Sequence, residues 1–211
     1  RSMDFREAAT AGARSVVIGV APSGGVLKAE WVSVLSEAIR SGLSLVSGLH
    51  CKLSEESELV EAAAASGQQL IDIRVPPASI SIATGRQRSG KRLLMVGTDC
   101  CVGKKYSALS LHKALQERGI SATFRATGQT GILIAGGGIP MDAVVSDFLS
   151  GAAETLTPDA ASDHWDVIEG QGSLFHPAYA AVTLGLLHGS QPDAMVLCHG
   201  SRSEEHTSEL Q

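Results

Sequence analysis

One short stretch constrains the fold of this chain more than any other. Residues 92–97 (RLLMVG) form an apolar run typical of a buried strand, and a helical pattern begins near Gly103. The loop between them contains small residues and leads into Lys104 and Lys105. This order favours a phosphate-binding loop, because curled backbone N–H groups and a helix N-terminus attract an anion. The stretch therefore predicts a parallel α/β domain with a phosphate site at the carboxyl end of a strand.

The loop departs from the usual GxxxxGK[ST] pattern at two positions. Five residues separate Gly97 from Gly103, so Thr98 takes the place of the first glycine. Lys105 stands where a Ser or Thr hydroxyl normally ligates Mg²⁺, and a second ammonium group repels the metal. We expect a loop that binds a phosphate-bearing ligand without a metal, formed by Gly97, Thr98, Asp99, Cys100, Cys101, Val102, Gly103, Lys104, Lys105 and Tyr106. The alternative is an ordinary glycine turn that joins strand to helix.

Strand and helix patterns alternate along the rest of the chain. Strands are expected at 15–22, 43–50, 69–75, 92–97, 121–126, 165–170 and 194–198, and helices at 29–42, 54–67, 103–118, 141–156 and 178–189. Ser54 is the expected N-cap of its helix, and Pro177 the expected first residue of the last one. The polar and basic segment 83–92 is typical of an exposed linker or mobile loop. This alternation predicts parallel sheets with helices on their faces.

Further candidate residues lie outside the loop. Glu169 ends a predicted strand, at the edge where ligands collect in parallel sheets, and His176 follows it. Both are candidate catalytic bases; a solvated carboxylate and a structural histidine are the alternatives. Arg125, Gln129 and Thr130 lie in the glycine-rich segment 124–140 and could bind carboxylate or phosphate oxygens. For that segment, a long flexible turn is the alternative.

Composition excludes some classes of partner. The 211 residues carry a net charge of −5, which argues against a general nucleic-acid or anionic-membrane binder. No apolar run approaches the roughly 20 residues of a membrane-spanning helix, and the first ten residues lack the apolar core of a signal peptide. Four cysteines, of which two are adjacent, do not suggest a disulfide framework. We expect a cytoplasmic protein with reduced thiols and no resident metal.

Three blocks carry a resemblance to a known family: residues 97–109, 124–154 and 163–194. Together they resemble the D-glutamate N-acetyltransferase (DgcN-type) family, long catalogued as a P-loop domain of unknown function. The P-loop half is also similar to dethiobiotin synthetases, through GTD, VGK and EGQG in the same order. The departure is Lys105, where those enzymes have Thr.

The resemblance implies an α/β chain in which a truncated Rossmann-like domain precedes a truncated P-loop domain. We assign residues 1–86 to the first domain, 87–200 to the second, and 201–211 to a non-native tail that reads as translated sequencing adapter. The implied activity is transfer of acetyl from acetyl-CoA to the amine of an acidic amino acid, with D-glutamate as the small-molecule substrate and a homo-oligomer compatible with it. The alternatives are an ATP- and Mg-dependent ligase or kinase of the dethiobiotin synthetase type, and a non-catalytic nucleotide-binding module.

Overall fold

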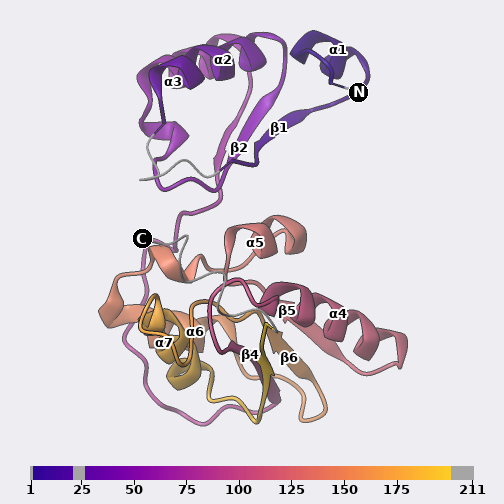
Figure 1. Cartoon of the computed structure of the whole chain (residues 1–211), viewed down its shortest axis with the longest axis vertical. Coiled ribbons are helices and arrows are strands. Elements are labelled where there is room, and N and C mark those ends of the chain that lie inside the picture. The colour runs from indigo at the N-terminus through magenta and orange to yellow at the C-terminus, as the bar shows by residue number, and fades with distance from the viewer. Residues whose placement is uncertain (1, 21–26, 201–211) are drawn as a thin grey trace. The chain divides into compact units, whose positions relative to one another are not determined.

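The computed structural model describes residues 2–20 and 27–200, which form two compact units that divide between Val75 and Pro76 (Figure 1). Every paired strand in the two sheets is parallel to its neighbour, which confirms the predicted α/β class. Residues 201–211, interpreted above as an adapter-derived tail, lie outside the described residues. No helix in the described ranges is long and apolar enough to cross a bilayer.

The N-terminal unit is a small parallel sheet covered by helices. Its strands β1 (Ser15–Ile18), β2 (Ser44–Ser47) and β3 (Leu70–Asp72) lie in the order β1-β2-β3. Its helices are α1 (Phe5–Thr10), α2 (Ala29–Arg40) and α3 (Ser57–Ser66). Helix α2 buries Val32, Leu35 and Ile39, which recur at helical spacing, against a core that includes Leu45 of β2 and Leu59 of α3.

Ser54 is not the N-cap of α3, contrary to the sequence prediction. A 3₁₀ turn, η2 (Leu53–Glu55), precedes the helix, whose cap is Glu56. The backbone N–H and the hydroxyl of Ser54 both donate to a carboxylate oxygen of Asp72, at 3.1 and 2.8 Å. Ser54 is therefore bonded to Asp72 at the end of β3 and does not cap α3.

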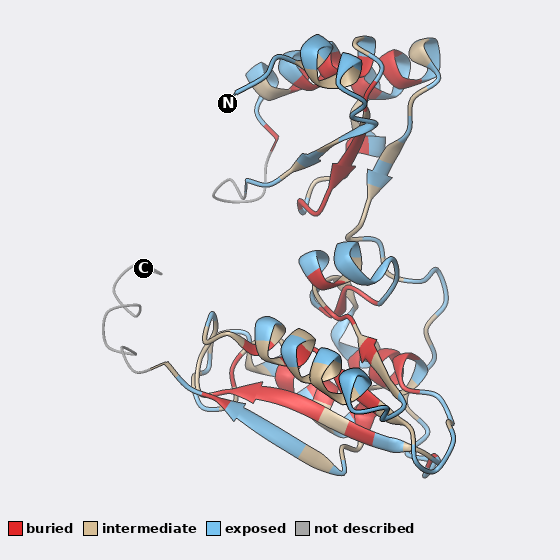
Figure 2. Cartoon of the chain, turned by 90° about the vertical axis from the view of Figure 1, so that its right-hand side faces the viewer, coloured by how far each residue is buried: buried red, intermediate tan, exposed pale blue. Residues whose placement is uncertain are grey.

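The second unit is a four-stranded parallel sheet in the order β5-β6-β4-β7. Its strands are β4 (Lys91–Gly97), β5 (Ala122–Arg125), β6 (Trp165–Ile168) and β7 (Ala194–Cys198). Helix α4 (Lys104–Glu117) covers one face, where Ala108 packs with Met95 and Phe124. Helices α6 (Leu149–Leu156) and α7 (Ala180–Ser190) cover the other face over Leu94 and Ile168. Figure 2 shows buried residues along the inner strands of the sheets, and exposed ones on edge strands such as β7 and on the outer sides of the helices.

Two local expectations for this unit are wrong, and one alternative is replaced by a helix. The helix predicted over 141–156 is two 3₁₀ turns, η3 (Met141–Ala143) and η4 (Ser146–Phe148), followed by the shorter α6. Helix α7 begins at Ala180 after Tyr179, whose left-handed backbone (φ 58°) ends the preceding loop, so Pro177 lies outside it. The glycine-rich segment holds a short helix, α5 (Gln129–Ala135), where a long turn was the alternative considered.

Arg88 is more deeply placed than Thr84, Arg86 and Ser89, which also anchor segment 83–92 to the second unit. Arg88 is only 5% exposed, although the segment's composition predicted an exposed linker. Its guanidinium donates to the backbone oxygens of Glu154 (3.0 Å), Gly189 (2.7 Å) and Ser190 (3.1 Å). These carbonyls lie in the last turns of α6 and α7, where helix carbonyls lack intrahelical partners and the helix dipole favours a cation. The linker prediction is therefore wrong at this residue, which ties two helix ends together.

Candidate functional site

The predicted phosphate loop connects β4 to α4 and has a curled backbone. Cys101 (φ 58°) and Gly103 (φ 92°) both adopt the left-handed conformation, and Gly103 is the N-cap of α4. Within the curl, the Cys100 N–H donates to Oδ1 of Asp99 at 2.6 Å. The curled loop therefore ends at the N-terminus of the fourteen-residue helix α4. The dipole of this helix favours an anion bound beside the loop.

Lys104 is the most buried charged group of the loop. Only 6% of it is exposed, and its Nζ donates to the backbone oxygen of Asp99 at 2.8 Å. Burial lowers the pKa of Lys104, an effect that the nearby Cys100 partly offsets. An ammonium group has three donors, so the bond to Asp99 leaves donors for a ligand. An anionic ligand beside Lys104 would favour its charged form and so oppose the effect of burial on its pKa.

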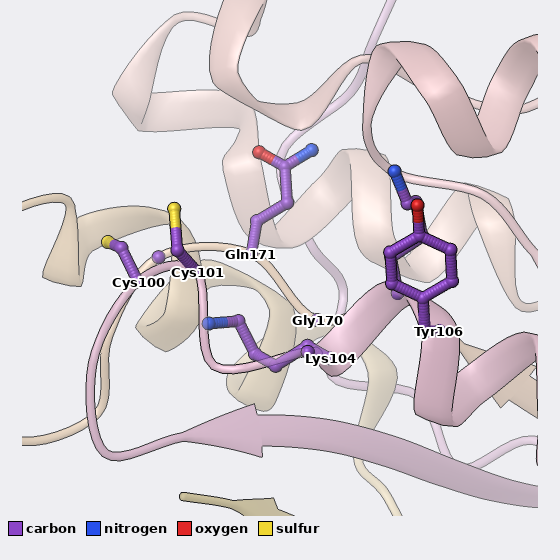
Figure 3. A pocket seen from close by; sticks show the side chains of 9 residues that line it. Cys100, Cys101, Lys104, Tyr106, Gly170 and Gln171 are labelled. Carbon is purple, nitrogen blue, oxygen red and sulfur yellow. The ribbon is translucent and has the colours of Figure 1, made fainter. Parts of the chain in front are cut away.

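A pocket of about 390 Å³ opens over this loop (Figure 3). Its walls come from the loop with the first turn of α4, and from the turn that follows β6. These two segments meet because β4 and β6 are parallel neighbours and end at the same edge of the sheet. The lining residues are Cys100, Cys101, Gly103, Lys104, Lys105, Tyr106, Gly170, Gln171 and Gly172.

Two glycines allow the close packing around Lys104: Gly97 within the loop, and Gly170 in the turn that follows β6. A Cβ at Gly97 would lie 2.7 Å from the backbone oxygen of Asp99 and 2.8 Å from Nζ of Lys104. A Cβ at Gly170 would lie 1.8 Å from the backbone oxygen of Met95 and 3.1 Å from Cδ of Lys104. Neither glycine has a positive φ, so both are required by the lack of space and not by backbone conformation.

Lys105 and Tyr106 form the outer part of the pocket on the first turn of α4. The Nζ of Lys105 lies 4.9 Å from the centroid of the Tyr106 ring, a cation–π distance. Tyr106 is 69% exposed although it lines the pocket. The pocket thus offers a buried ammonium group, a second ammonium group nearer to solvent, and an exposed aromatic ring.

Glu169 lies next to the pocket residue Gly170 but is itself buried, with 4% exposed. Its Oε2 accepts hydrogen bonds from the backbone N–H groups of Thr127 (2.9 Å) and Gly128 (3.0 Å), where the chain enters α5. Burial raises the pKa of Glu169, whereas these two N–H donors and the Lys105 charge act in the opposite direction. A Cβ at Gly131 would lie 2.1 Å from Oε2, so the first turn of α5 must carry a glycine there. The solvated carboxylate considered from the sequence is not what the structure shows.

His176 is held by its neighbours in the loop before α7. Its backbone N–H donates to the Ser173 hydroxyl at 2.8 Å, and its Nδ1 accepts from the Ala178 N–H at 3.2 Å. A neutral imidazole carries one proton, so Nδ1 as an acceptor leaves that proton on Nε2. In this arrangement His176 is a hydrogen-bond donor through Nε2 and not a proton acceptor.

The three predicted substrate-binding residues are not among those that line the pocket. The Nε of Arg125 donates to Oδ1 of the buried Asp166 at 2.7 Å. Gln129 and Thr130 are exposed at the start of α5. A role for Arg125 with a substrate carboxylate therefore has to accommodate its existing ion pair.

The structure adds two residues that the sequence interpretation did not include. Gln171 lines the pocket, and its side-chain amide donates to the backbone oxygen of Thr127. His199 follows β7, and its Nδ1 lies 3.0 Å from the Thr98 hydroxyl oxygen. The parallel pairing of β4 with β7 brings the carboxyl end of β7 to the loop, and the apolar strand predicted at 194–198 just before His199 was the available signal.

The comparisons with known proteins agree in placing both parts of the chain. Residues 81–210 match the P-loop domain of unknown function DUF1611_C, and residues 2–76 match the Rossmann-like domain DUF1611_N. A crystal structure of a DUF1611 family protein from Anabaena variabilis is similar with a TM-score of 0.85 and 39% identity, over 93% of this chain and 57% of that one.

Two curated relatives are named D-glutamate N-acetyltransferase. The protein from Pseudoalteromonas sp is 58% identical over 92% of this chain, and the one from Tritonibacter scottomollicae is 56% identical over 93% of it. The chain spans 58% and 59% of the length of these relatives. Since both domain matches together cover nearly all of its residues, the chain belongs to the DUF1611 family of two-domain Rossmann-like and P-loop proteins.

Proposed function

We propose that the full-length protein is an N-acetyltransferase that moves acetyl from acetyl-CoA to the amine of D-glutamate. The observation that carries this proposal is the shared name of the two relatives at 58% and 56% identity. The part of the chain that these relatives match includes every residue that lines the pocket. The proposal takes this pocket as the binding site of the acetyl donor.

The chemistry of the pocket supports acetyl-CoA as the donor. Coenzyme A carries phosphate groups, and the pocket offers them the ammonium groups of Lys104 and Lys105 at a helix N-terminus. Transfer of an acyl group from a thioester needs no metal bound to these phosphates. Lys105, at the position of the usual magnesium-binding hydroxyl, suits such a ligand better than it suits Mg-ATP.

The reaction needs a proton acceptor and a donor for the oxyanion. The neutral amine attacks the thioester carbonyl, the carbon–sulfur bond breaks, and the amine proton goes to a base while the CoA thiolate leaves and is protonated. Glu169 is the proposed base, because a carboxylate whose pKa burial raises binds a proton more tightly than an exposed one. The Nε2–H of His176 is the proposed donor to the developing oxyanion. Gln129 and Thr130 remain the proposed contacts for the substrate carboxylates, with Arg125 as a third.

Thiol release tests the proposal directly. Purified full-length protein is mixed with acetyl-CoA and D-glutamate in the presence of a chelator, and free thiol is measured; the expected result is release that L-glutamate does not match. Lys104→Ala should lower the rate, whereas Lys113→Ala, at an exposed ion pair on the same helix, should not. Release of phosphate from Mg-ATP without any acetyl transfer would instead support the ligase alternative and reject this function.

A further inference from the structure

We propose that Tyr106 is a stacking platform for a nucleobase, so that the pocket selects a nucleotide-bearing phosphate ester over a simple polyphosphate or a base-free phosphate. Only the choice of coenzyme A as the ligand to test first rests on the proposed acetyltransferase function. It assigns Tyr106 to ligand specificity, separately from the lysines that attract the phosphates.

The position of the ring is the first argument. Tyr106 lines the pocket, yet 69% of it is exposed, so its ring is not part of a core. Figure 3 shows the ring standing on the first turn of α4, on the far side of the Lys104 side chain from Cys100 and Cys101. An exposed ring beside a phosphate site offers a flat apolar surface to whatever the phosphate carries, and every nucleobase has a matching π-face.

The size of the pocket is the second argument. Its volume of about 390 Å³ lies toward the small end of ligand sites, which span about 300 to 1,000 Å³. The phosphates occupy the enclosed part beside Lys104, which is buried. The base of a nucleotide would then extend beyond the enclosed part, where the exposed ring of Tyr106 lies.

The neighbouring Lys105 couples the two parts of the site. Its ammonium group lies 4.9 Å from the Tyr106 ring centroid. A phosphate makes a charge-assisted hydrogen bond with an ammonium group, which is a stronger interaction than an exposed cation–π contact. A phosphate that bonds to Lys105 therefore lies beside the Tyr106 ring, and the base attached to it is within reach of that ring. A ligand with both parts contacts Lys105 and Tyr106 together.

Binding measurements on the full-length protein test the proposal. Coenzyme A and 4′-phosphopantetheine, which lacks the nucleotide, are titrated into the wild type, Tyr106→Phe, Tyr106→Leu and Phe175→Ala by calorimetry. Leu removes the π-face but keeps an apolar side chain, whereas Phe keeps the ring. Phe175, at 70% exposed and not part of the pocket lining, is the matched exposed aromatic control.

We expect Tyr106→Leu to weaken coenzyme A binding by about 5- to 150-fold, the range measured for loss of one base–aromatic stack. Binding of 4′-phosphopantetheine should change by less than about twofold, and the Phe and control variants should bind both ligands like the wild type. An equal loss for both ligands would mean general damage to the pocket and would overturn the proposal. Unchanged coenzyme A affinity in Tyr106→Leu would overturn the proposal as well. So would failure of the wild type to bind either coenzyme A or ATP, which is the second nucleotide probe.

The outcome is separable from that of the proposed function. If thiol release fails but Tyr106→Leu still loses affinity for coenzyme A or ATP and not for the base-free ligand, the base platform stands without acetyl transfer. If acetyl transfer succeeds and Tyr106→Leu uses acetyl-CoA with an unchanged KM, the function stands and the platform is rejected.

Discussion

Replacement of Gly170 by Ala should destabilise the second unit because the turn after β6 lies against the backbone of β4. The new Cβ would start 1.8 Å from the backbone oxygen of Met95, a residue that is 1% exposed. To reach even the 3.0 Å below which real Cβ contacts essentially never fall, the two segments must separate by about 1.2 Å. Strand β4 pairs with β6 on one side and β7 on the other, so it cannot move freely. We expect a cost of about 3 kcal/mol, the upper end of ordinary overpacking.

Urea unfolding followed by tryptophan fluorescence measures this cost against a matched glycine. Gly137→Ala is the control, because a Cβ there has nothing within 4 Å and its φ is not positive. The control should leave stability unchanged or raise it by less than about 1 kcal/mol, since Ala reduces the entropy of the unfolded chain. Gly170→Ala should also weaken coenzyme A binding, since its Cβ would lie 3.1 Å from Cδ of Lys104. Two variants of equal stability would refute the close-approach reasoning.

Three further outcomes follow from the contacts. Arg88→Met should lower the free energy of unfolding by about 3 kcal/mol in urea, because it removes charge-assisted bonds to three backbone oxygens at the ends of α6 and α7; a change within about 0.5 kcal/mol would contradict the anchor. Burial raises the pKa of Glu169 above its usual value of 4.5, so the folded state binds this proton more tightly than the unfolded state. The free energy of unfolding should therefore decline as the pH rises from 4.5 through the pKa of the folded state. Glu169→Gln should flatten that part of the stability–pH curve, and an unchanged slope would exclude Glu169 as its source. Iodoacetamide should modify the exposed Cys101 faster than Cys100, whose pKa burial raises, and coenzyme A should slow the reaction at Cys101; mass spectrometry of peptides reads both rates.

The strand–loop–helix arrangement of β4 and α4 could be predicted because its determinants are local. An apolar strand, a loop of small residues, Lys104 and a helical pattern follow one another within one stretch of chain, and each element forms from its own neighbours. The alternation of strands and helices likewise predicts parallel sheets with little knowledge of distant contacts. The strand order β5-β6-β4-β7, which brings Gln171 and His199 to the loop, depends on packing between segments far apart in sequence.

The surroundings of Glu169 could not be predicted for the same reason. Its two N–H donors, Thr127 and Gly128, precede it by more than forty residues, and no local pattern links them. Helix α5 was not predicted either, because glycine is a poor helix former and the segment reads as a turn. Gly131 is in that helix because the Glu169 carboxylate occupies the space where a Cβ would be. The helix propensity of glycine tells how much Gly131 destabilises the helix. It does not reveal the distant Glu169 side chain that leaves no room for a Cβ.

The pair Glu169 and Gly170 shows how one turn serves two different contacts. The Glu169 side chain is directed to the start of α5, while the absence of a side chain at Gly170 lets the turn lie on β4 and beside Lys104. The same two adjacent residues thus position α5 and the buried Lys104. Any substitution that moves the turn, including Gly170→Ala, should therefore disturb the carboxylate bonds and the lysine together. Glu169→Gln keeps the size of the side chain and should change the proton equilibrium alone, so comparison of the two variants separates the position of the carboxylate from its charge.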